Sequence, residues 1–224
     1  MRLISSAACA ATLAMVLSCG AAQAATISGL YNTGVDDAGV ALAGGNGVVD
    51  THYLIASNAP GYFNKPAVTY YNGAYLADDA DSRWVSLDAD GVPDSAPNGS
   101  TTSYGFLFDL TGFDLSTVVI SGGFAADNAA GISLNGFEIN LVANGYTALT
   151  PFLLTTGFRE GINTLEFTVL DFGAPTALRV DNLVGRGELL SSGAIPEPGT
   201  WALMIAGFGL AGCALRRRSR TVGA

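Results

Sequence analysis

Short runs of β-branched and aromatic residues, separated by glycine-rich turns, fill the middle of this 224-residue chain. In one run, Leu165, Phe167 and Val169 alternate with Glu166, Thr168 and Leu170, as in a strand with one buried face. No long stretch has a helical period. The pattern therefore predicts an all-β fold, an antiparallel sandwich or jelly roll, with strands near residues 48–55, 66–71, 104–110, 117–121, 164–172 and 177–184.

Asn-Gly pairs mark the expected turns, because asparagine and especially glycine tolerate positive φ. Asn135-Gly136 lies between two apolar runs and is the strongest hairpin signal. The other pairs are at residues 72–73, 98–99 and 144–145.

Composition excludes several classes of protein. The chain is 49% hydrophobic and 13% charged, with a mean hydropathy of +0.37, which argues against intrinsic disorder. A net charge of −9 argues against nucleic acid as a partner, since phosphate binding needs clustered cations. The single histidine and the 3 cysteines argue against a His-rich metal enzyme.

The first 24 residues have the pattern of a secretory signal peptide. Arg2 precedes an Ala-rich apolar stretch, and Ala22 and Ala24 are the small residues of a cleavage site that ends at Ala24. The alternatives are lipoprotein processing at Cys19, which ends a loose lipobox, and a transmembrane anchor or buried helix.

The C-terminal segment combines three features in order. Pro196-Glu197-Pro198 cannot propagate a helix, and residues 200–215 form an apolar segment that begins beside Trp201. A basic tail, 216–220, follows with Arg216, Arg217 and Arg218. By the positive-inside rule the arginines stay cytoplasmic, so we expect one transmembrane helix with the rest of the chain translocated.

Together, residues 196–220 resemble a PEP-CTERM sorting signal. The resemblance implies a Gram-negative source and recognition by an exosortase. It also implies a transient inner-membrane intermediate, then delivery to the cell surface or the extracellular matrix of a biofilm. A generic tail anchor is the alternative.

The expected domain is residues 25–187, followed by a linker at 188–195. Residues 25–195 contain no cysteine, so packing rather than disulfides must stabilise them. They hold 18 of the 19 acidic residues but five of the ten basic ones, so their net charge is about −13. This body resembles the galactose-binding-like β-sandwich ectodomain of PEP-CTERM proteins, in segments that include residues 30–36, 82–85, 108–113, 125–128, 134–136, 157–158, 161–165 and 178–180.

Two candidate binding features stand out. Asp88, Asp90 and Asp94 alternate along a Gly-containing loop and are candidate Ca²⁺ ligands, although the spacing is not that of an EF-hand and a solvated acidic turn is the alternative. Asp78, Asp79 and Asp81 form a neighbouring acidic cluster. Aromatic residues gather in the first half of the body, where we expect Trp84 in the core and Tyr62, Phe63 and Tyr75 exposed as glycan contacts.

No catalytic constellation is recognisable, because His52 is the single histidine and no nucleophile-elbow motif occurs. The sequence thus predicts an exported, non-catalytic protein with a structural or adhesive role in exopolysaccharide. It predicts no cofactor, apart from the candidate Ca²⁺. The alternatives are a lectin-like carbohydrate-binding module and, less favoured, a carbohydrate-active enzyme.

Overall fold

The computed structural model describes residues 24–57, 64–92, 99–190, 203–208 and 210. The described residues of the body form nine strands: β1 (Ala24–Thr26), β2 (Val49–Ser57), β3 (Lys65–Thr69), β4 (Val85–Ser86), β5 (Thr101–Asp109), β6 (Val119–Leu134), β7 (Phe137–Leu154), β8 (Ile162–Leu170) and β9 (Ala177–Glu188). The six predicted strands overlap β2, β3, β5, β6, β8 and β9, so the expected all-β class is confirmed.

The strands pair antiparallel in the order β1-β9-β4-β3-β2-β5-β8-β6-β7. An additional pairing of β9 with β6 closes the sheet on itself. One layer contains β1, β9 and the first part of β6. The other contains β3, β2, β5, β8 and the last part of β6. Because β4 also joins the layers, pairing with both β3 and β9, the result is a sandwich with a barrel-like closure.

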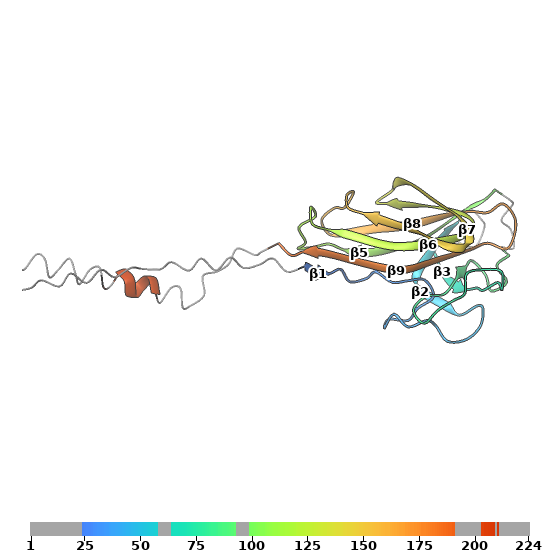
Figure 1. The fold of residues 1–224 in the computed structure, drawn as a ribbon, viewed down its shortest axis with the longest axis horizontal. Helices are drawn as coiled ribbons and strands as arrows, with labels where there is room; N and C mark the ends of the chain where they lie inside the picture. The colour runs from blue at the N-terminus through green and yellow to red at the C-terminus, as the bar shows by residue number, and fades with distance from the viewer. Residues whose placement is uncertain (1–23, 58–63, 93–98, 191–202, 209, 211–224) are drawn as a thin grey trace, which may run out of the picture.

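The chain enters and leaves the body at the same end. Ala24 in β1 pairs with Glu188 at the end of β9, and Figure 1 shows β1 beside the C-terminal end of β9 at one end of an elongated body. β9 continues through Glu188, Leu189 forms a bridge with Phe113, and the amide of Leu190 donates to Gly112 O. The β structure thus extends past residue 187, into the segment expected as a linker.

Every second side chain of β8 points into the core. Leu165, Phe167 and Val169 are buried, as predicted, and Phe167 packs against Phe124 of β6 and Phe152 of β7 with ring centroids 5.6 and 5.9 Å away. Aromatic rings at such distances contribute to stability beyond the area that they bury. The core is therefore where the two layers meet.

The β6–β7 hairpin confirms one turn prediction. Asn135 and Gly136 have φ values of 55° and 80°, and Leu134 pairs with Phe137 across them. Two successive positive φ angles are those of a type I′ turn, whose twist matches that of paired strands.

The turn predicted at Asn144-Gly145 is wrong, because both residues lie inside β7. Gly145 has a φ of 109° and lies opposite Ala126, where the β6–β7 register shifts. The glycine serves a strand irregularity here, which needs the same positive φ as a turn.

The tail has little described structure. Residues 203–208 and 210 are helical, and Leu203, Ile205 and Phe208 expose at least 70% of their surface. Over the described positions, no helix is long and apolar enough to cross a membrane. Trp201 and Arg216 to Arg218 lie outside those positions, so the transmembrane helix stays a prediction.

Candidate functional site

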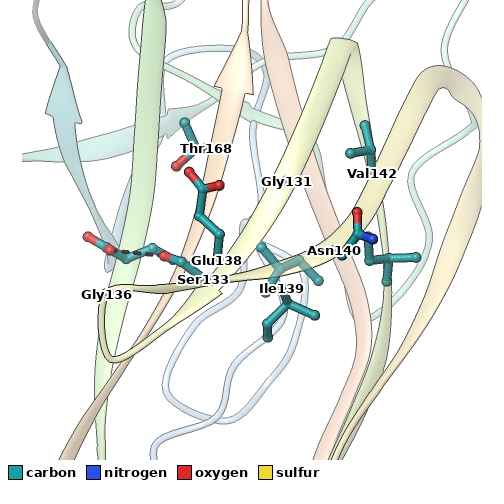
Figure 2. Close-up of a pocket in the computed structure, with 11 residues that line it drawn as sticks. Gly131, Ser133, Gly136, Glu138, Ile139, Asn140, Val142 and Thr168 are labelled. Carbon is teal, nitrogen blue, oxygen red and sulfur yellow. Dashed lines mark hydrogen bonds between the residues drawn. The ribbon is translucent and has the colours of Figure 1, made fainter. Parts of the chain in front are cut away.

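A groove of about 530 Å³ lies on the outer face of β6, β7 and β8 (Figure 2). Five polar side chains line it. Ser133 comes from β6, Glu138 and Asn140 from β7, and Glu166 and Thr168 from β8. Their hydroxyl, amide and carboxylate groups offer donors and acceptors over one open surface.

The pleat of the sheet directs these side chains outward. Ser133 lies between the buried residues Ile132 and Leu134, and Glu166 lies between Leu165 and Phe167. Successive side chains of a strand point to opposite faces, so the residues that fill the core fix the polar ones in the groove.

An irregularity in β7 opens the hollow. Ile139 pairs with Ile132 and Val142 pairs with Gly131, so two additional residues of β7 bow away from β6. Gly131 adds depth because it has no side chain; a Cβ built there would have Leu141 O, at 4.0 Å, as its nearest atom. Bulges of this kind re-aim side chains at the rims of sheets.

Glu166 is held in the middle of the face. Ser133 Oγ donates to Glu166 Oε2 at 3.2 Å, and a Cβ at Gly105 would lie 3.0 Å from Glu166 Cγ. Gly105 therefore leaves the space in which Glu166 lies. Ser133 is opposite both Glu166 and Glu138, so the two glutamate backbones are two strand spacings, roughly 9–10 Å, apart.

A second hollow of about 420 Å³ lies beside the groove over β2 and β5, and Glu166 lines both. Leu54 and Leu107 give this hollow a more apolar surface. His52 also lines it, with its ring stacked on Tyr31 at 3.7 Å and its Nε2 3.1 Å from Asp37 Oδ1. The histidine thus holds the residue 31–37 segment against β2.

The expectation that Tyr75 is an exposed glycan contact is wrong. Tyr75 is 6% exposed, packs against Trp84 with ring centroids 4.6 Å apart, and donates its hydroxyl to Asp127 Oδ2 at 2.7 Å. Burial of the ring and satisfaction of its hydroxyl give it a structural position. Trp84 is fully buried, as predicted, while Tyr62 and Phe63 lie outside the described residues.

The loop expected to bind Ca²⁺ contains a local turn. Asp90 Oδ1 accepts from the amide of Val92 at 2.9 Å, and Gly91 has a φ of 70°. An aspartate that caps its own turn adopts this arrangement without a metal. Asp94 lies outside the described residues, so the site of Asp88, Asp90 and Asp94 stays a prediction.

Arginine side chains pair with the neighbouring acidic cluster of Asp78, Asp79 and Asp81. Asp78 Oδ2 lies 3.2 Å from Arg83 Nε, while Asp79 and Asp81 bring carboxylate oxygens within 4.8 Å of each other and of Asp181. The 1%-exposed Arg179 places its Nη2 2.5 Å from Asp79 Oδ2 and 3.1 Å from Asp181 Oδ2, donates through Nε to Ser82 Oγ at 2.9 Å, and donates through Nη1 to Ala77 O. Burial alone would raise the pKa of Asp79, but Arg179 and a hydrogen bond from Ser82 hold that pKa below its ordinary value.

Sequence reasoning did not single out the groove residues, although two signals were available. The alternation of β8 places Glu166 and Thr168 on its outer face, and the Asn135-Gly136 hairpin places Ser133 opposite Glu138. The pairing of β6 with β8 joins residues more than thirty positions apart and has no local sequence signal.

Comparison with known proteins identifies the tail. The PEP-CTERM protein-sorting motif matches residues 194–219, which confirms the sorting signal predicted around Pro196, Glu197 and Pro198. The motif indicates an exported protein that an exosortase processes and that is sorted to the cell envelope or surface. No curated protein matches the chain significantly.

Solved structures similar to the body include carbohydrate-binding modules. A variant of the family 29 module CBM29-2 complexed with mannohexaose has a TM-score of 0.37 and 11% identity, covering 73% of this chain and 92% of that one. TmCBM61 in complex with beta-1,4-galactotriose has a TM-score of 0.35 and 8% identity, covering 63% and 92%. The CBM36-1 domain of a multidomain xylanase from the hindgut metagenome of Trinervitermes trinervoides has a TM-score of 0.29 and 10% identity, covering 75% and 98%.

Replacing Arg179 with methionine removes the cation that compensates Asp181, which is 4% exposed. We expect Arg179→Met to lower the free energy of unfolding by about 3–5 kcal/mol, because it leaves a buried carboxylate unpaired. Urea denaturation measures the loss. Adding Asp181→Asn should restore part of it. A loss of unfolding free energy below about 1 kcal/mol in Arg179→Met is typical of an exposed ion pair, and it would contradict a structural role for the Arg179–Asp181 pair.

The Tyr75–Asp127 hydrogen bond predicts a pH-dependent stability. Burial raises the pKa of Asp127 above 3.8, and the hydroxyl of Tyr75 partly opposes that rise by stabilising the carboxylate. An acid with a raised folded-state pKa makes stability fall as the pH rises from 3.8 through that raised value. Tyr75→Phe should therefore cost about 1.5–3 kcal/mol at neutral pH, where the carboxylate is ionised, and about 0.5–1.5 kcal/mol near pH 4.

Urea denaturation of both proteins at the two pH values tests this expectation. Tyr70→Phe is the matched control, since Tyr70 packs beside Tyr75 with ring centroids 6.1 Å apart and its loss should cost the same at both values. A Tyr75→Phe cost that is equal at the two pH values, or larger in acid, would contradict the assignment.

Proposed function

We propose that this exported protein binds a glycan in the groove of β6, β7 and β8, and acts without catalysis as a component of the cell surface or the surrounding exopolysaccharide. The observation that carries the proposal is the groove itself, with its five polar side chains on three adjacent strands. Ligand sites are concave and fix their ligands through a few placed polar groups. A chain of sugar units presents hydroxyls that can both donate to and accept from such groups.

The shape of the groove favours an extended ligand. It lies on an open sheet face, and a second hollow continues across β5 to β2, with Glu166 on the border between them. A polymer that crosses the strands would contact side chains of all five strands of the face. Among the described residues that line the groove or the second hollow, the aromatic ones are Phe106 and His52. Because so few aromatic rings are available to stack on sugars, recognition here relies on hydrogen bonds.

The destination supports the same function. An exosortase substrate reaches the envelope or surface, where polysaccharide is available as a ligand. We further propose that the signal peptide is cleaved after Ala24 and that the tail spans the inner membrane until processing. Cleavage after Ala24 would leave Ala25 and Thr26 paired with β9.

Mass spectrometry of the mature protein from the cell surface tests this processing. We expect a polypeptide that begins at Ala25 and lacks Arg216, Arg217 and Arg218, because both terminal segments are removed after translocation. An intact C-terminal arginine cluster in the surface-exposed form would contradict exosortase processing. A lipid-modified Cys19 would support lipoprotein export instead.

Filling the groove tests the binding site. Gly131→Ile places a branched side chain in open space, with Leu141 O 4.0 Å from the new Cβ. We expect glycan binding to fall at least tenfold on an array of neutral and charged oligosaccharides. Stability should be kept or raised slightly, since glycine weakens a strand interior.

Val119→Ile is the matched control, because Val119 lies 39% exposed at the other end of β6. Unchanged binding by Gly131→Ile would place the ligand elsewhere, and failure of the unaltered protein to bind any glycan would contradict the proposed function. Release of shorter sugars during the assay would contradict the non-catalytic role.

A further inference from the structure

We infer that the groove selects polysaccharides that contain unacetylated amino sugars, whose ammonium groups pair with Glu138 and Glu166. This inference rests on the proposed function, since it names the class of glycan that the same groove takes. It adds a charge requirement that a general hydrogen-bonding groove would not have.

The charge of the groove has one sign. Among the described residues that line it, the charged ones are Glu138 and Glu166, and none is basic. The adjoining hollow adds Glu166 again and His52. A ligand that lies in the groove therefore meets carboxylates without a compensating cation in the lining. Like charges brought together at a binding surface oppose association, so a uronate-rich chain is disfavoured.

The geometry presents both carboxylates to one ligand. Ser133 pairs with Glu138 on one side and with Glu166 on the other, so the three side chains form a row across β7, β6 and β8. Figure 2 shows Ser133, Glu138 and Thr168 around one hollow. A chain that crosses these strands would pass both glutamates.

The donor inventory points to the same ligand. An ionised carboxylate only accepts hydrogen bonds, whereas an ammonium group only donates them. Ser133 supplies one donor to Glu166 Oε2, at 3.2 Å, and an ammonium group would supply donors that are charged. Charge-assisted hydrogen bonds are about twice as strong as neutral ones, so an amino sugar gains more here than its N-acetylated form.

The surrounding body reinforces the selection. Residues 25–195 carry 18 of the 19 acidic residues, and two of their five basic residues, Arg83 and Arg179, are engaged in ion pairs. At low ionic strength, this excess of negative charge attracts cationic chains and repels anionic ones before they touch the groove.

Two hexasaccharides that differ only in acetylation test the inference. The mature surface protein is titrated by calorimetry at about pH 5.5, where the amines of the ligand are protonated. The two ligands are a β-1,4-linked glucosamine hexamer and its fully N-acetylated counterpart. We expect the glucosamine hexamer to bind at least tenfold more tightly. The preference should shrink in high salt, because salt screens charge pairs.

Charge-neutral variants identify the residues responsible. Glu138→Gln and Glu166→Gln keep the shape of the side chain and one acceptor oxygen but remove its charge. Each should reduce affinity for the glucosamine hexamer about tenfold and should change affinity for the acetylated hexamer less than twofold. Glu188→Gln, at the far end of β9, removes the same charge outside the groove and should leave both affinities unchanged.

The outcomes separate this inference from the proposed function. Equal or tighter binding of the acetylated hexamer overturns the charge requirement but keeps a glycan-binding groove. If Glu188→Gln lowers the affinity for the glucosamine hexamer as much as the groove variants do, the preference comes from the net charge of the whole body, and the charge requirement of the groove is also overturned. Ca²⁺-dependent binding of a polyuronate oligomer would assign the glutamates to a bridging cation instead. Binding of no glycan at all contradicts the proposed function itself.

Discussion

Strand β6 hydrogen-bonds to three neighbours, and both the core and the groove depend on that pairing. One edge of β6 follows β7, while the other pairs first with β9, from Val119 to Asp127, and then with β8, from Ala129 to Leu134. This change of partner joins the two layers and brings Phe124 of β6 against Phe167 of β8. It also brings Ser133 beside Glu166. With no cysteine in residues 25–195, the closure is maintained by packing, hydrogen bonds and ion pairs such as those of Arg179, without a disulfide.

The same β6–β8 register determines which residues face the groove and which face the core. A slip of one residue in the β6–β8 pairing would turn Glu166 into the core and Phe167 into the solvent. Burial of Leu165 and Phe167 therefore fixes the outward position of Glu166 and Thr168 as strongly as it fixes the core itself. Selection for a stable core thus also maintains the positions of the polar residues, whereas their chemical identity is free to respond to a ligand.

Local signals in the sequence were sufficient to place β2, β3, β5, β6, β8 and β9 and one turn, but not β1 or β4 or the full length of β7. The Asn135-Gly136 pair predicts the hairpin, and alternation predicts the buried face of β8, because both depend on residues that are neighbours in the chain. The same type of signal failed at Asn144-Gly145, where the positive φ serves an irregularity inside β7. It failed at Tyr75 because burial there depends on Trp84 and on Asp127, which follows 52 residues later. The groove also depends on pairing between strands that are distant in the sequence, β6 and β8. The sequence shows which polar residues these strands contain, but it does not show that they lie side by side.

The acidity of the body acts on two length scales. Over a distance, 18 carboxylates favour solubility and repel anionic polymers, but mobile ions screen such effects beyond about 8 Å at physiological ionic strength. In the proposed site, a glycan seated in the groove would therefore be discriminated by the charges that touch it. Glu138 and Glu166 lie in the groove without a basic neighbour in its described lining, whereas Asp79 and Asp181 share an ion pair with Arg179. In the proposed site, selectivity between glycans would therefore arise mainly from these two carboxylates, while the net charge of the body would add a weaker and salt-sensitive attraction.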